Sequence, residues 1–261
     1  MDGSLAADAR ALIASARSLV EELAEEDIDQ YERPDPETIS VAAPDPEPAV
    51  LSGPVAAREE TAEAFRLEST EPTWGESRDL EAVRRELGDC TRCGLAAGRT
   101  QIVFGDGNPH ADLMFIGEGP GQEEDRRGLP FVGRAGELLT QMIEKGLGIP
   151  RSEVYICNIV KCRPPNNRTP QGGEVAACRP FLDGQIAAVR PKVIVALGKP
   201  AASLLLGRDV AITRLRGTWH TVDDIPLMPT LHPAYILRQY TPENRRHVWE
   251  DLKAALERSR E

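Results

Sequence analysis

The stretch Ala-Asp-Leu-Met-Phe-Ile-Gly-Glu-Gly-Pro-Gly, residues 111–121, decides the fold class of this chain. It begins with a short apolar run typical of a buried β-strand, 111–117, and ends in a glycine-rich loop. We expect three further strands, at 154–161, 193–198 and 227–231. Helical patterns occupy 78–88, 134–147, 171–189, 199–206 and 242–258. This alternation predicts a three-layer α/β/α fold with a central, mostly parallel four-stranded sheet.

The loops that follow the expected strands are where a ligand site should be sought. In open α/β sheets the ligand crevice lies outside the carboxyl ends of the strands. Polar segments follow the strands at 111–117, 154–161 and 227–231, and we expect these three loops to meet at one edge of the sheet.

The first of these loops is rich in glycine and in carboxylates. Its leading residues are Gly117, Glu118, Gly119, Pro120 and Gly121. An acidic run at 123–125, which includes Glu124, follows directly. The loop lacks the Gly-Lys-Ser/Thr of a Walker motif and the glycine spacing of a dinucleotide fingerprint. Carboxylates at this place suggest acid–base or water-positioning chemistry instead.

Three further side chains at the predicted strand ends are candidates for ligand contact. Phe131 lies in a loop, where it either stacks on a planar ligand or anchors the loop. Asn158 interrupts an apolar strand, so its buried amide either ties backbone groups or reads the edge of a base. His232 precedes Pro233 at a strand end, and the convergence of the three loops favours a catalytic donor over a structural histidine.

The cysteines form a second group of candidates. Cys90 and Cys93 make a CxxC pair, whereas Cys162 and Cys178 are separated more widely. Four thiolates of this kind bind either zinc or an iron–sulfur cluster, and the spacing does not decide between them. Cys157, on the expected strand, is interpreted as a buried small hydrophobic residue.

Composition and charge exclude several protein classes. The chain has 261 residues, 41% hydrophobic but only 5% aromatic, so its core must be mostly aliphatic. No apolar stretch is long enough to span a membrane, and the acidic N-terminus does not resemble a secretory signal. The odd number of cysteines argues against a disulfide framework and for a reducing compartment. We expect a cytoplasmic protein that acts as a monomer and binds no membrane.

The net charge of −11 is divided unevenly along the chain. Residues 1–77 carry a net charge of −14 and residues 78–261 a net charge of +3. The second part is therefore compatible with an anionic partner such as nucleic acid. We expect an acidic extension at 1–77, with an amphipathic helix at 4–26 and a Pro-rich disordered linker at 27–77. The helix either packs loosely or docks a protein partner.

Three strings of the second part resemble family 4 uracil-DNA glycosylases, the iron–sulfur-containing branch of that superfamily. The strings are GEGPGQEEDRRGLPFVGRAGELL at 117–139, NIVKCRPPNNRTP at 158–170 with AACRPFL at 176–182, and LHPAYILR at 231–238. The resemblance extends over residues 80–258 and leaves out 1–77. It implies a 4Fe–4S cluster on Cys90, Cys93, Cys162 and Cys178, with Cys157 outside the set.

The resemblance also implies a reaction, hydrolysis of the N-glycosidic bond of deoxyuridine in DNA, which releases uracil and leaves an abasic site. The nucleotide must first be flipped out of the base stack. Gly119, Pro120 and Gly121 would then shape the pocket floor, Phe131 would stack on uracil, and Asn158 would read its edge. His232 would stabilise the departing base, while Glu118 or Glu124 would position water or stabilise the sugar.

Several alternatives stay open at this point. A non-catalytic iron–sulfur or zinc module that binds nucleic acid would explain the cysteines but not Asn158 and His232. An enzyme of free nucleotides is a further alternative. No His-containing insertion follows Cys162, so turnover is favoured over a covalent adduct with the abasic site. The candidates for phosphate contact are Arg163, Arg168, Arg214, Arg216 and Arg238.

Overall fold

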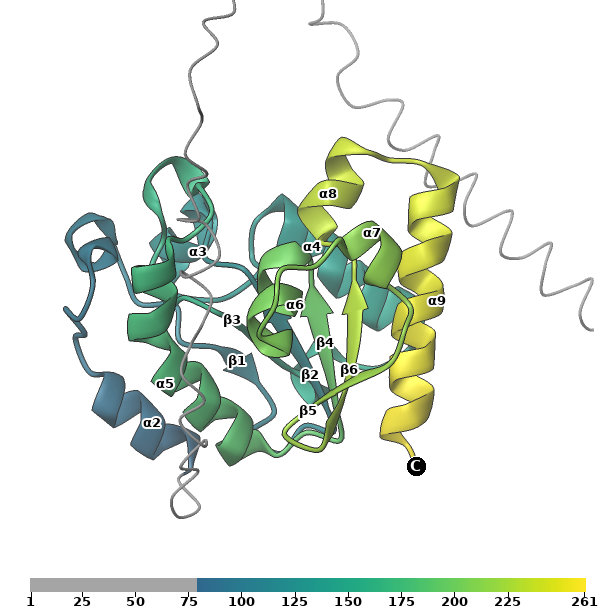
Figure 1. Ribbon diagram of the computed structural model, residues 1–261, viewed down its shortest axis with the longest axis horizontal. Helices are drawn as coiled ribbons and strands as arrows, with labels where there is room; N and C mark the ends of the chain where they lie inside the picture. The colour runs from purple at the N-terminus through teal and green to yellow at the C-terminus, as the bar shows by residue number, and fades with distance from the viewer. Residues whose placement is uncertain (1–78) are drawn as a thin grey trace, which may run out of the picture. The chain divides into compact units, whose positions relative to one another are not determined.

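A computed structural model describes residues 79–261, and Figure 1 shows how their helices and strands are arranged. The expected helix at 4–26 and the expected linker at 27–77 lie outside the described residues. No helix within 79–261 is both long and apolar enough to cross a membrane.

Six strands form one sheet in the described part of the chain. They are β1 (Asp106–Gly107), β2 (Leu113–Gly117), β3 (Tyr155–Asn158), β4 (Val193–Leu197), β5 (His220–Val222) and β6 (Ile225–Thr230). The order across the sheet is β1-β3-β2-β4-β6-β5. The four central strands are parallel and are the four expected from the sequence. Two short antiparallel strands, β1 and β5, extend the sheet at its edges, and both are too short to show a hydrophobic period.

Helices surround this sheet. The α-helices are α2 (Leu80–Leu87), α3 (Gln122–Arg127), α4 (Arg134–Gln141), α5 (Gly172–Val189), α6 (Lys199–Leu206), α7 (Ile212–Leu215), α8 (Pro233–Arg238) and α9 (Pro242–Ser259). A π-helical segment, η4 (Met142–Leu147), continues α4, and short 3₁₀ turns are η3 (Gly94–Gly98), η5 (Arg151–Glu153) and η6 (Pro165–Asn167). All five expected helices are therefore present, while α3, α7 and α8 are short additions.

Alternation along the strands explains the three layers. Met114 and Ile116 of β2 pack into one core with residues of α5 and α6, such as Leu182 and Ala202. Phe115, between them, faces the opposite core. That second core contains residues of α4, η4, α8 and α9, and Figure 1 shows α5 and α9 on opposite sides of the sheet. Because all five residues of β2 are buried, the sheet is covered on both faces, as parallel sheets usually are.

Candidate active site

A cavity of about 670 Å³ lies where the loops after β2, β3, β4 and β6 meet. The structure brings all eight expected catalytic and base-contacting residues to its wall: Glu118, Gly119, Pro120, Gly121, Glu124, Phe131, Asn158 and His232. This is the edge at which doubly wound sheets hold their ligands.

Asn158 is the last residue of β3 and pairs with Gly117 of β2. The residue is 1% exposed, and its Oδ1 is the one buried side-chain oxygen or nitrogen of residues 79–261 without a hydrogen-bond partner. An unpaired buried acceptor costs roughly 1–3 kcal/mol. Since Asn158 lines the cavity, a ligand that donates a hydrogen bond there would recover this free energy.

Phe131 is held against Asn158 and His232 by an unusual backbone conformation. Its φ of 51° lies in the left-handed region, and its ring centroid is 5.7 Å from that of His232. Two glycines make this arrangement possible. A Cβ on Gly117 would lie 2.5 Å from both Asn158 Oδ1 and Phe131 Cζ, and a Cβ on Gly136 would lie 1.9 Å from the Phe131 carbonyl carbon. Glycine is therefore required behind the ring.

His232 caps the N-terminus of α8, and its Nδ1 accepts a hydrogen bond from the Ala234 N–H at 3.1 Å. Burial lowers the pKa of His232 to about 4, the positive charge of Arg238 lowers it too, and the negative charge of Glu124 opposes the shift. The imidazole is consequently neutral at pH 7. Because Nδ1 is an acceptor, the proton lies on Nε2, which is free to donate to a ligand.

The two glutamates of the first loop have different surroundings. Glu124 Oε1 accepts hydrogen bonds from Val132 N and Gly133 N, both at 2.8 Å, and its Oε2 accepts one from Gly121 N at 3.1 Å. Both carboxylate oxygens of Glu124 thus accept hydrogen bonds from backbone N–H groups. Burial raises the pKa of Glu118, and a hydrogen bond from Thr169 and the charge of Arg238 act against that shift.

One wall of the cavity was not predicted from the sequence, and it is formed by Gly198, Lys199 and Pro200 at the start of α6. Gly198 has a φ of 88°, and a Cβ there would lie 3.0 Å from the Cβ of His232. The signal was present, because a glycine follows an apolar strand at this place as it does at Gly117.

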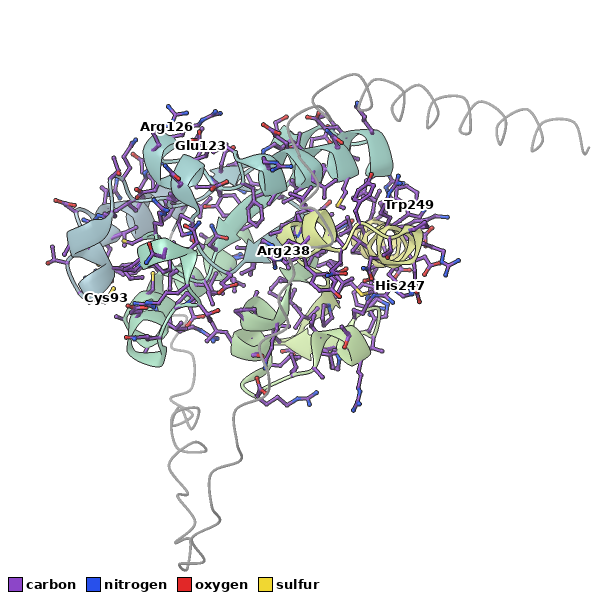
Figure 2. The ribbon with its side chains drawn as sticks, turned by 90° about the horizontal axis from the view of Figure 1, so that it is seen from above. Cys93, Glu123, Arg126, Arg238, His247 and Trp249 are labelled. Atoms are coloured by element: carbon purple, nitrogen blue, oxygen red, sulfur yellow. The ribbon has the colours of Figure 1, made fainter. Side chains whose placement is uncertain are left out.

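The five expected phosphate-contact residues differ in position, and Arg163 and Arg214 are not among the described residues that line the cavity. Arg168 and Arg238 line the cavity, and Figure 2 shows Arg238 between Cys93 at one side of the view and Trp249 at the other. Arg216 is instead directed inward, where it pairs with the buried Asp251 and donates to the His247 carbonyl at 2.9 Å. The interpretation of Arg216 as a phosphate contact is therefore wrong, because its guanidinium is already bound within the protein.

Four cysteines gather on the α5 side of the sheet. Burial raises the pKa of the Cys162 and Cys178 thiols, and nearby thiols, Cys93 for both and Cys90 for Cys178, raise it further. Cys157 is fully buried among apolar residues of the core, as expected.

Nitrogen donors lie close to three of these thiols. Arg92 Nη1 lies 3.7 Å from Cys90 Sγ, Arg99 Nη1 lies 3.5 Å from Cys162 Sγ, and the backbone N–H of Lys161 bonds to Cys178. Within residues 79–261, no three His, Cys, Asp or Glu side chains are arranged to hold a single metal ion.

Comparisons with known proteins agree with this geometry. Residues 104–253 match the family model of the uracil DNA glycosylase superfamily. A type-4 uracil-DNA glycosylase of Thermotoga maritima is 49% identical over 180 residues, which cover 67% of this chain and 92% of that protein. Proteins of the same name from Sulfurisphaera tokodaii and Saccharolobus solfataricus are 46% and 42% identical, with 67% and 69% of this chain and 82% and 86% of theirs covered.

Proposed function

This chain belongs to the uracil-DNA glycosylase superfamily and is a DNA-repair hydrolase that removes uracil from DNA, and we propose that the cavity between β2, β3, β4 and β6 is where it does so. The observation that carries this assignment is the buried, unpaired Oδ1 of Asn158 in the cavity wall. The proposal covers the role of each residue, the cofactor and the setting in which the enzyme works.

Recognition of uracil rests on Asn158. The amide oxygen accepts from uracil N3–H, and the amide nitrogen donates to O4. Cytosine presents an acceptor at N3 and a donor at N4, so both contacts would be lost and two buried groups would stay unpaired. Phe131 stacks on the flipped base, and Gly119, Pro120 and Gly121 form the adjoining floor.

Stabilisation of the leaving group rests on His232. Cleavage of the glycosidic bond leaves negative charge on the base, and the Nε2–H of the neutral imidazole donates to O2 as this charge develops. A preorganised donor of this kind contributes roughly 3–4 kcal/mol to the transition state. The bond from Ala234 N to Nδ1 supports this role because it fixes the tautomer.

Water activation rests on Glu118. Its pKa is raised by burial, which makes its carboxylate a stronger base than an exposed glutamate. Glu124 then serves to hold Gly121, Val132 and Gly133, so that the loop keeps its shape around the base. Arg238, on the rim of the same cavity, is suited to contact phosphates, whereas the guanidinium of Arg168 is already paired with Glu174.

The cysteines fit a 4Fe–4S cluster on Cys90, Cys93, Cys162 and Cys178. The N–H donors at three of these sulfurs support the cluster, because hydrogen bonds to the sulfurs are one of the ways a protein stabilises and tunes such a group. When bound, it supplies a structural link between the α2–η3 loop, the loop after β3 and α5.

The setting follows from the same residues. The five cysteines, four of which are proposed to hold the cluster, fit a reducing compartment such as the cytoplasm.

One assay tests the function. The purified protein is incubated with an oligonucleotide that contains a single uracil, and the product is treated with alkali to cleave abasic sites. We expect strand cleavage at the uracil and none with the thymine-containing control. Uncleaved uracil DNA would contradict the function.

A further inference from the structure

Among residues 79–261, the hydrogen-bond partners of the buried Lys161 ammonium are all uncharged. The residue is 1% exposed and lies between Asn158 and Cys162 in the chain. Its Nζ donates to the Asn158 backbone oxygen at 2.7 Å and to Gln185 Oε1, and both acceptors are uncharged. Asp183 is close enough to feel the lysine charge but forms its ion pair with Arg179, at 2.5 Å. An ammonium group in such surroundings needs a countercharge.

The thiols on the α5 side are in the place where this countercharge is needed. The backbone N–H of Lys161 bonds to Cys178, and Gln185, the partner of Lys161 Nζ, lies on α5, the helix that also carries Cys178. Cys178 and Cys162 belong to the proposed cluster set, and a cluster bound by four thiolates is anionic. Lys161 therefore faces negative charge whenever the four cysteines hold iron.

The Lys161 side chain also supports the wall of the cavity. The bond to the carbonyl of Asn158 fixes the residue whose amide faces the base. Gln185, the other partner, is fully buried and donates to Phe104 O at 2.8 Å and to Tyr155 Oη at 3.0 Å. This network of Lys161, Gln185 and Tyr155 ties the end of β3 to its start and to α5.

We propose that Lys161 is a positioning residue that is both the buried counter-ion of the cysteine-bound cluster and the tether that keeps Asn158 in its base-reading position. The inference rests on the proposed cluster and on the proposed role of Asn158. It links two sites that the reaction itself does not connect.

The test uses the iron-loaded full-length enzyme and a Lys161→Met variant. Spectroelectrochemical titration should give the variant a more negative reduction potential, because loss of a nearby positive charge disfavours the added electron. The inhibition constant of free uracil should rise about tenfold or more, as happens when outer supports of a site are removed. Affinity for uracil-free DNA should stay unchanged. The control is Lys192→Met, an exposed lysine 3.8 Å from Asp112, which should match the wild type in all three.

A second variant keeps the test decisive if Lys161→Met does not fold. Gln185→Glu keeps an acceptor for Nζ but places a negative charge beside it, so the reduction potential should fall below that of the wild type. Wild-type potential and wild-type inhibition in the folded variants would overturn the inference alone. A wild-type protein that excises uracil yet binds no iron would overturn the cluster and the inference together. A wild-type protein that excises nothing would instead contradict the function.

Discussion

The ends of β3 and β6 present two different kinds of side chain to one cavity. At β3, the Asn158 amide oxygen is buried and unpaired. Beyond β6, the His232 ring has one nitrogen already bonded to the Ala234 N–H, which leaves the other with a fixed proton. The difference separates recognition from catalysis. A side chain that recognises the base must keep an unused hydrogen-bonding atom for the ligand. A catalytic histidine must have its tautomer fixed before the ligand binds.

The supports behind these two ends differ as well. Behind β6, Asp251 accepts from Thr230 Oγ1 at 2.6 Å and is neutralised by Arg216 within the protein. Behind β3, the hydrogen-bond partners that Lys161 has within the described residues are all neutral. The buried charge behind β6 is thus paired within the folded chain. The buried charge of Lys161 behind β3 is balanced by the cluster that we propose on the cysteines.

The largest effect is expected at the β6 end. His232→Ala should lower kcat for uracil excision by about 100- to 1,000-fold, since it removes a donor that acts on the developing anion. Binding of uracil DNA should change much less. Single-turnover rates and binding isotherms measure the two quantities, with the exposed His110→Ala as control. Equal losses of rate and affinity would indicate a structural histidine.

A smaller loss of rate is expected at the β3 end. Asn158→Asp should slow uracil excision by about ten- to a hundredfold, because the carboxylate lacks the amide donor to O4 and loses one or two buried contacts. The exposed Asn166→Asp, in the loop after β3, is the matched control. Unchanged excision by Asn158→Asp would mean that Asn158 does not read the base.

The support behind β6 can be broken separately. Asp251→Asn should reduce the free energy of unfolding by about 3 kcal/mol, because the guanidinium of Arg216 would lose its charged partner in a buried ion pair. Urea unfolding measures this loss. Asp112→Asn, in an exposed pair with Lys192, should cost less than about 1 kcal/mol. Similar losses for the two variants would show that the Asp251 pair is no stronger than a surface pair.

The smallest effect concerns residues 1–77, whose net charge is −14. Their deletion should leave excision active, because all eight expected catalytic and base-contacting residues lie within 79–261. We expect the truncated enzyme to bind DNA a few-fold more tightly at low salt, with the difference vanishing as salt screens it. Binding measured across a salt series checks this. Superimposable salt curves would favour the alternative, a helix at 4–26 that docks a partner.

The sequence predicted this architecture well where the signal is local. Apolar runs located the four central strands, and polar residues at their ends located Asn158 and His232. Contacts between distant segments could not be predicted, because no local pattern encodes them. Glu124 accepts hydrogen bonds from the backbone of Gly121 and Val132 only in the folded loop. Likewise, Arg216 is recognised as an internal residue only through Asp251, which lies 35 positions later.

The division of labour between the two strand ends is tested most directly by one ratio, the single-turnover excision rate of uracil divided by that of cytosine in the same DNA context. The account predicts that His232→Ala lowers both rates and keeps the ratio of the wild type, because the histidine contacts an oxygen, O2, that both bases carry. It predicts that Asn158→Asp lowers the ratio, since a carboxylate cannot donate to uracil O4 but can accept from the N4 amino group of cytosine. A ratio that falls in His232→Ala, or one that holds in Asn158→Asp, would contradict the account.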